Sequence, residues 1–189
     1  MKIILGSSSP FRKELFSRIA ENFDSMSPDI DEKAIRSDDP KELVLKIAHA
    51  KADALVKRIT EPSILVTADQ VAIFKNDIRE KPESEEEARK FIQSYAGNEA
   101  AVLNGIVVTN TATGKRAEGT ERASISYDAS LVNDIDPIID DSNWKKSSGA
   151  FLSENPYMKK HEVKRDGNED SFFGIPIKLT KRLIDEVQN

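Results

Sequence analysis

The chain has 189 residues, the size of one ordinary domain, and 32% of them are charged, above the ~25% of an average globular protein. Its 28 basic and 33 acidic residues give a net charge of −5, and the lack of a long basic cluster disfavours nucleic-acid binding. Because there is no cysteine and the two histidines, His49 and His161, are isolated, disulfides, thiolate sites and histidine metal sites are excluded, so any metal must bind to oxygen atoms.

No apolar run approaches the ~18 residues of a membrane-spanning segment, so no membrane partner is expected. The start of the chain, Met1 to Leu5, is too short for the apolar core of a signal peptide. These features predict a soluble protein of the cytoplasm.

The beginning of the chain predicts a strand, a polar loop and a helix. Ile3 to Leu5 is a short apolar run, the loop spans Gly6 to Ser9, and Pro10 suits the first turn of a helix that Ser9 caps. The predicted buried stripe of this helix consists of residues at four-residue steps, namely Phe11, Leu15 and Ile19.

Capping residues predict two further helices. Asp39 begins one that runs to about Arg58, with Glu42 placed to complete a capping box. Ser84 begins the other, with Glu87 in the corresponding position.

The β-branched content of Ser63 to Phe74 predicts a long strand. Ala101 to Asn110 and Ala117 to Tyr127 predict an antiparallel hairpin across the turn Thr113 to Lys115, and Leu131 to Trp144 is weakly helical.

Residues 153–170 are polar and show no pattern, and Ile175 to Val187 closes the chain as an amphipathic helix begun by Pro176. Strands that alternate with helices and are followed by a hairpin imply an α/β fold with a mixed sheet. In such folds ligands favour the crevices at strand ends.

The first candidate for chemistry is the small-residue loop before Pro10, from Leu5 to Ser9. Free N–H groups at a helix N-terminus favour a phosphate, and Arg12 and Lys13 add cations within one turn. An ordinary strand-to-helix turn with surface charges is the alternative, and the spacing of Phe11 favours a core role over contact with a ligand.

The second candidate is Asp69, a carboxylate inside the apolar run from Ile64 to Ile73. Burying it without a partner would cost several kcal/mol, so it needs a cation, a hydrogen-bond network or an open site. In a regular strand Asp69 and Gln70 would face opposite sides, and both could line one site only where the strand ends or bulges.

Two lysines and an acidic loop complete the candidates. Lys51 lies on the apolar stripe of its helix, where it either snorkels to solvent or points its ammonium into a cavity. Asp29 to Glu32 groups carboxylates, of which Mg²⁺ commonly uses one or two together with substrate phosphates, although a solvated acidic loop is the common alternative. Lys81, in a predicted loop, either approaches a phosphate or is a free surface residue.

In their order and spacing, short segments along nearly the whole chain resemble the Maf family of nucleoside triphosphate pyrophosphatases. These segments are Leu5 to Leu15, Asp29 to Glu32, Ala48 to Ala52, Ala68 to Val71, Lys81-Pro82, Gly149 to Phe151 and Gly174 to Pro176.

The resemblance implies one Maf-like domain over residues 1–189. Its fold would be elongated and similar to that of Maf and inosine-triphosphatase proteins, with a mixed twisted sheet flanked by helices and a central cleft. The implied activity is hydrolysis of a nucleoside triphosphate to the monophosphate and pyrophosphate with a divalent metal, usually Mg²⁺, with Mn²⁺ or Co²⁺ as alternatives. The expected partner is therefore a nucleotide, and a homodimer is left open.

Residue by residue, the resemblance assigns the catalytic roles to charged positions. Asp69 matches the family's proton acceptor, and Lys51 and Lys81 match catalytic cations at the phosphates. Arg12 matches a further phosphate contact, while Glu32, together with Asp69, matches the carboxylates on the metal side.

The same resemblance assigns substrate contacts. Ser8 belongs to the phosphate loop, and Phe11, Gln70 and Glu154 match the positions that set base choice. The branch of the family that acts on dTTP and UTP has arginine, threonine and glutamine there, so this chain is more similar to the 7-methyl-GTP branch. Removal of modified nucleotides is the implied role.

Two other functions compete with this hypothesis. The family's association with septum formation allows a nucleotide-binding regulator of cell division with little or no activity. A scaffold domain without a ligand is the plain alternative, and failure of every nucleotide to raise the melting temperature would support it.

Overall fold

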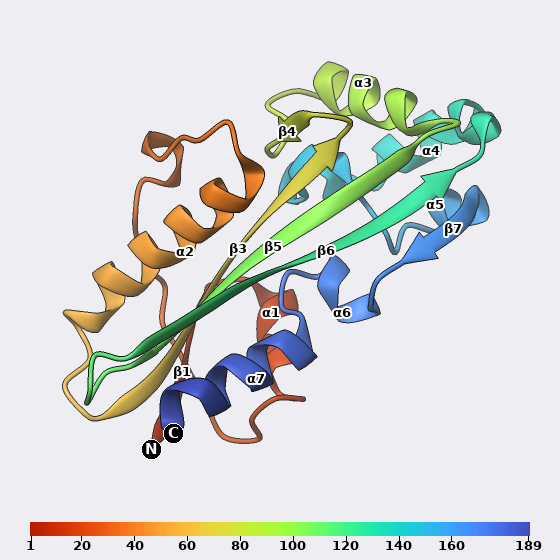
Figure 1. The fold of residues 1–189 in the computed structure, drawn as a ribbon. Coiled ribbons are helices and arrows are strands. Elements are labelled where there is room, and N and C mark those ends of the chain that lie inside the picture. The colour runs from red at the N-terminus through yellow and green to blue at the C-terminus, as the bar shows by residue number, and fades with distance from the viewer. The chain divides into compact units, whose positions relative to one another are not determined.

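The computed structural model describes every residue from Met1 to Asn189 and divides into two compact units. The first unit comprises Met1–Gln70, Asn104–Glu121 and Asn168–Asn189, and the second comprises Val71–Leu103 and Arg122–Gly167. The long strands β3 (Ser63–Phe74), β5 (Glu99–Asn110) and β6 (Arg116–Tyr127) contribute residues to both units (Figure 1).

The strands form a seven-stranded sheet in the order β2-β1-β3-β5-β6-β7, with β4 paired to β3. The remaining strands are β1 (Lys2–Gly6), β2 (Asp24–Ser25), β4 (Asp77–Arg79) and β7 (Glu162–Asp166). Strand β1 is parallel to β2 and β3, whereas β4 is antiparallel to β3 and β7 to β6. This combination confirms the predicted mixed α/β sheet.

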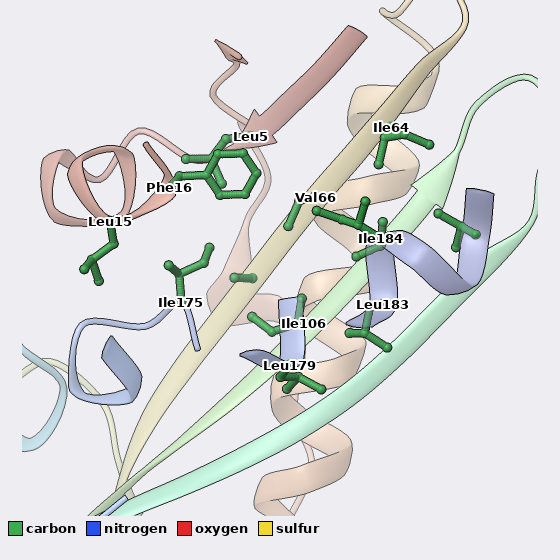
Figure 2. Packing of buried hydrophobic residues seen from close by; sticks show 13 residues of the cluster. Leu5, Leu15, Phe16, Ile64, Val66, Ile106, Ile175, Leu179, Leu183 and Ile184 are labelled. Atoms are coloured by element: carbon green, nitrogen blue, oxygen red, sulfur yellow. The ribbon is translucent and has the colours of Figure 1, made fainter. Parts of the chain in front are cut away.

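Helices cover both faces of the sheet in the first unit. They are α1 (Pro10–Phe16), α2 (Pro40–Val56), α6 (Glu169–Phe172) and α7 (Ile177–Gln188), with the short 3₁₀ helix η1 (Glu32–Ala34). Alternation along β3 sends Ile64 and Val66 into the core with α1 and α7 (Figure 2). Leu65, between them, enters the core with α2. Whether a later residue of β3 lies at an odd or an even position therefore decides which helices its side chain faces.

The second unit has short helices around an aromatic centre. They are α3 (Glu85–Tyr95), η2 (Ala129–Asp134), α4 (Ile135–Asp140), η3 (Asn143–Lys146), η4 (Ser148–Ala150) and α5 (Pro156–Lys160). The ring of Tyr95 lies 5.6 Å from that of Phe74, 6.5 Å from that of Tyr127 and 6.0 Å from that of Phe151, between centroids. No helix of the structure is both long and apolar enough to cross a bilayer.

The predicted helix caps are confirmed, but neither predicted capping box forms. At α3 the Glu87 carboxylate accepts from the Glu83 N–H and not from that of the cap, Ser84. Ser9, Asp39 and Ser84 each accept a hydrogen bond from a backbone N–H in the first turn of their helices. Glu42 does not reach back to the backbone of Asp39, because Ser37 stands between them: its hydroxyl accepts from the Asp39 N–H and donates to Glu42.

The segment 153–170 is more ordered than its composition predicts. Asn155 caps α5 by accepting from the N–H groups of Tyr157 and Met158. Strand β7 follows and pairs antiparallel with β6. A polar strand at the edge of a sheet lacks the apolar alternation that would predict it from the sequence. Pairing with its neighbour stabilises such a strand.

Candidate functional site

Helix α2 carries Lys51 into the interior of the first unit. Its buried positions recur at helical spacing, and Lys51 falls among them with only 4% of its surface exposed. The ammonium donates to Asp69 Oδ1 at 2.8 Å and to the carbonyl of Ala68 at 3.3 Å, and it lies 3.2 Å from Glu32 Oε1. The snorkelling alternative is therefore wrong: the side chain points toward carboxylates in the protein.

Strand β3 supplies Asp69 on the side that faces α2. Leu65 packs against α2, the hydroxyl of Thr67 donates to the carbonyl of Ala48 in that helix, and Asp69 follows at the same parity. Asp69 is 6% exposed, and its partner Lys51 compensates much of the cost of burying the carboxylate. Of the three alternatives predicted for Asp69, a cation, a hydrogen-bond network or an open site, the structure shows the cation.

Arg12 and Glu32 complete a cluster of opposite charges. Arg12 donates from Nη1 to the carbonyl of Ala68 at 2.9 Å, next to Asp69 in the chain. Glu32 begins η1, which Asp31 caps by accepting from the Lys33 N–H. The cluster of Arg12, Glu32, Lys51 and Asp69, which we call the charged cluster, gathers two cations and two carboxylates from separate segments of the first unit.

Burial and charge act in opposite directions on the proton affinity of Asp69. Burial raises the pKa of Asp69 above its ordinary value, and Glu32 raises it further, while Lys51 and Arg12 lower it. Burial also lowers the pKa of Arg12, which Asp69 and Glu32 partly restore, and a guanidinium remains charged at neutral pH. A carboxylate with a raised pKa beside two cations suits proton transfer next to an anionic substrate.

The loop before α1 uses two of its serines to hold its own shape. Ser7 accepts from the Ser9 N–H, and Ser9 accepts from the Arg12 N–H. Ser8 is exposed, so its hydroxyl faces outward from the turn. Glycine is needed at position 6 for packing, because a Cβ there would lie 2.6 Å from Thr67 Cγ2.

Gln70 faces the other side of β3 from Asp69, as regular alternation predicts. Its Nε2 donates to Asn104 Oδ1 at 3.0 Å and to the carbonyl of Ser171 at 3.0 Å. Asn104 is fully buried and also donates to the Ser171 carbonyl, so it anchors the amide of Gln70. Asn104 was not predicted as a site residue, although an amide inside the apolar strand Ala101 to Asn110 is the same kind of signal that identified Asp69.

The prediction that Phe11 belongs to the buried stripe of α1 is wrong. Phe11 is 56% exposed, whereas Leu15 and Phe16 are the residues of α1 that enter the core. Helix α1 has only seven residues, so its one buried face is occupied at its C-terminal end. The ring of Phe11 instead meets Phe173, at a centroid distance of 6.1 Å.

In the second unit, Lys81 is exposed, and the two residues that precede it are held by contacts within that unit. The carbonyl of Glu80 accepts from the Gly149 N–H at 2.7 Å. The guanidinium of Arg79 lies over the rings of Phe74 and Phe91, at 4.3 and 4.6 Å from their centroids. Lys81 is therefore an exposed side chain that follows two anchored residues.

Glu154, also in the second unit, is paired within that unit. Its carboxylate forms a salt bridge with Lys159 and lies 3.8 Å from Arg165. The structure thus brings Arg12, Glu32, Lys51 and Asp69 together, and it places Lys81 and Glu154 at separate positions of the second unit.

The family profile described as Maf-like protein matches residues 2–187. This chain belongs to the Maf family. Among its relatives, a Dictyostelium discoideum protein named 7-methyl-GTP pyrophosphatase is 41% identical, with 98% of this chain and 96% of the relative covered. An Idiomarina loihiensis protein of the same name is 30% identical over 93% of this Maf chain and 89% of its own.

Among solved structures, the Maf chain is similar to a nucleoside-triphosphatase, or dITP/XTP pyrophosphatase, from Mycobacterium abscessus. The two share 14% identity and a TM-score of 0.41, with 68% of this chain and 75% of that chain covered. This is a weak likeness.

The charged cluster contains oxygen ligands of the type that magnesium uses together with phosphates. Glu32 and Asp69 offer two carboxylates, and Mg²⁺ is commonly bound by one or two carboxylates together with substrate phosphates and water. No group of three or more acidic, histidine or cysteine side chains is arranged to hold a metal without such additional ligands.

Proposed function

We propose that this Maf protein hydrolyses 7-methyl-GTP to 7-methyl-GMP and pyrophosphate. The observation that carries the proposal is the buried Asp69, with a raised pKa, beside Lys51 and Arg12. The names of relatives at 41% and 30% identity support both the reaction and this substrate.

In the proposed reaction a water oxygen forms a bond to the α-phosphorus, and the bond from that phosphorus to the oxygen bridging to the β-phosphorus breaks. Pyrophosphate leaves with the electron pair of the broken bond. Asp69 accepts the proton of the attacking water, for which a carboxylate of raised pKa is better suited than an ordinary one.

The cations of the site have an electrostatic role. The triphosphate and the carboxylate of Asp69 are both negative and repel each other. Arg12 and Lys51 lie beside Asp69 and would neutralise part of the charge on the triphosphate. Lys81 is proposed to contact the departing pyrophosphate with its exposed ammonium, and Ser8 to contact the phosphates from its loop. Positioning and electrostatics supply most of the catalysis in phosphoryl transfer.

A divalent metal, Mg²⁺ or alternatively Mn²⁺ or Co²⁺, would be held by Glu32 and Asp69 with oxygens of the substrate. When bound, it would supply positive charge at the phosphates. In its presence Lys51 would keep the two carboxylates oriented, since the ammonium touches both.

The test is release of pyrophosphate from 7-methyl-GTP, GTP, dTTP and UTP in the presence of Mg²⁺. We expect kcat/KM for 7-methyl-GTP to exceed those for dTTP and UTP by about 10-fold or more, which corresponds to ~1.4 kcal/mol. A preference for dTTP or UTP would overturn the substrate assignment. Binding of nucleotides without any turnover would instead favour a regulator of cell division.

We also propose that the protein works on free nucleotides in the cytoplasm, without nucleic acid or membrane as a partner. A homodimer is the assembly to test, by light scattering of the purified chain with and without nucleotide.

A further inference from the structure

Two aromatic side chains of the first unit lie together beside Arg12. Phe11 is 56% exposed, and Phe173, which follows α6, is partly buried against the core shared by α1, β3 and α7. Their planes are inclined by 33° at a centroid distance of 6.1 Å. An exposed aromatic ring contributes little to folding, so the pair offers apolar area to a molecule outside the chain.

Arg12, the residue after Phe11, is packed against the residue after Phe173. Gly174 has a φ of +86°, and a Cβ at that position would lie 2.8 Å from Arg12 Nε and 3.0 Å from Nη2. The guanidinium therefore fills the space that a side chain at Gly174 would need. As a result, Phe11-Arg12 and Phe173-Gly174 lie side by side, with ring near ring and guanidinium over glycine.

Gln70 is tied to the same segment. Its Nε2 donates to the carbonyl of Ser171 at 3.0 Å and lies 3.4 Å from that of Phe172. A cation suited to phosphate therefore lies beside the aromatic pair, and the Gln70 amide holds the segment that carries Phe173.

We propose that Phe173 and Phe11 form a stacking platform for a cationic purine, which makes Phe173 a specificity-determining residue. The inference rests on the proposed function, because it concerns the base of that substrate. Methylation of guanine at N7 gives the base a positive charge, and the face of an aromatic ring attracts a cation. A neutral guanine would gain only the stacking and apolar contact.

The spacing of the rings indicates how the base would lie. Contacting carbon atoms are about 3.5–4.0 Å apart, so a base inserted between two rings would need about 7 Å between their planes. The Phe11 and Phe173 rings are too close and too inclined for this. The base would therefore lie over the outer surface of the pair.

The experiment compares Phe173→Leu with wild type, using 7-methyl-GTP and GTP as substrates and 7-methyl-GMP as a ligand for calorimetry. Leucine keeps apolar area but has no ring face. We expect KM for 7-methyl-GTP and Kd for 7-methyl-GMP to rise roughly 3- to 30-fold, with a smaller change for GTP. Phe173→Tyr, which keeps the ring, should restore the preference for the methylated base.

Phe23→Leu is the matched control, because Phe23 is a partly buried aromatic residue against the same core and meets the ring of Phe16 edge to face. It should leave the ratio between 7-methyl-GTP and GTP unchanged. Equal losses for both nucleotides in Phe173→Leu, or a shifted ratio in Phe23→Leu, would overturn the platform while leaving the proposed hydrolysis intact. If wild type binds 7-methyl-GMP and Phe173→Leu weakens it but no nucleotide is hydrolysed, the platform stands and the proposed reaction fails.

Discussion

Lys51 and Lys81 belong to different compact units and lie in different surroundings. Lys51 is 4% exposed, and its ammonium contacts Asp69 and approaches Glu32. Lys81 is exposed, and the two residues before it are held by the aromatic contacts of the Arg79 side chain and the hydrogen bond of the Glu80 carbonyl. In the first unit Lys51 is buried among charges that contact it, whereas in the second unit Lys81 is exposed to solvent.

If both ammonium groups bind the phosphates, the free-energy cost of holding each one in position would differ. A buried ammonium is already held in position, but it also changes the proton affinity of the carboxylates that it contacts. An exposed ammonium is screened by solvent and must lose rotamer freedom on binding, so its contribution is smaller and more independent. The following substitutions test whether the two units differ in this way.

The largest effect is expected from Asp69→Asn, which should lower kcat/KM by at least about 10²-fold while the protein still folds. The amide cannot accept the proton of water, and it lacks the charge that a metal needs. Pyrophosphate release and circular dichroism measure the two properties. Asp53→Asn is the control, since Asp53 pairs with Arg116 on the surface of the same unit and should tolerate the change. Retained activity in Asp69→Asn would remove this residue from the reaction.

Lys51→Met should lower kcat/KM roughly 10- to 100-fold. Expressed as a free energy, this loss should exceed the loss in folding stability. Asp69 can take up a proton when its cationic partner is absent, which limits the cost to folding. Lys46→Met, at an exposed position of α2 paired with Glu42, is the control. Wild-type kinetics in Lys51→Met would contradict the assignment of its ammonium to the phosphates.

The same variant should change the pH dependence of activity. If the base is the carboxylate form of Asp69, kcat/KM rises with pH as this group loses its proton. Lys51 lowers the pKa of Asp69 against the opposing effect of burial, so Lys51→Met should move the acidic limb of the profile to higher pH. A limb that stays in place, or moves to lower pH, would show that another group controls it.

Lys81→Met should lower kcat/KM by roughly 10-fold with no change in melting temperature, because the exposed ammonium takes no part in packing. High salt should reduce the difference between this variant and wild type. Lys90→Met is a matched control in the same unit, with an exposed ammonium paired to Glu86. A loss as large as that of Lys51→Met would contradict the contrast between the units.

The smallest effect is expected from Glu154→Gln, which should reduce the preference for 7-methyl-GTP over UTP by about 3-fold. Lys159 and Arg165 already neutralise much of the charge of Glu154, so less of it remains to attract a cationic base. Glu162→Gln, which also loses a pairing with Arg165, is the control for changes in that ion-pair network. An unchanged preference in Glu154→Gln would remove this residue from base choice.

Local rules of the chain were sufficient for much of the fold. Strand β3 has the predicted bounds, Ser63 to Phe74, because β-branched and apolar side chains continue through it. The helices after Ser9, Asp39 and Ser84 begin where these caps predict, since a cap acts on backbone within its own turn. The alternation that separates Asp69 from Gln70 is likewise a property of any regular strand.

Only tertiary structure decided where the long side chains point. The helical stripe placed Lys51 at a buried position, but snorkelling and a buried ion pair were both open until β3 and η1 brought carboxylates to it. Phe11 lies outside the core, because Leu15 and Phe16 fill the buried face of a short helix. Strand β7 is stabilised by its pairing with β6. In each case the deciding partner is distant in sequence, so its contribution to the free energy cannot appear in any local pattern.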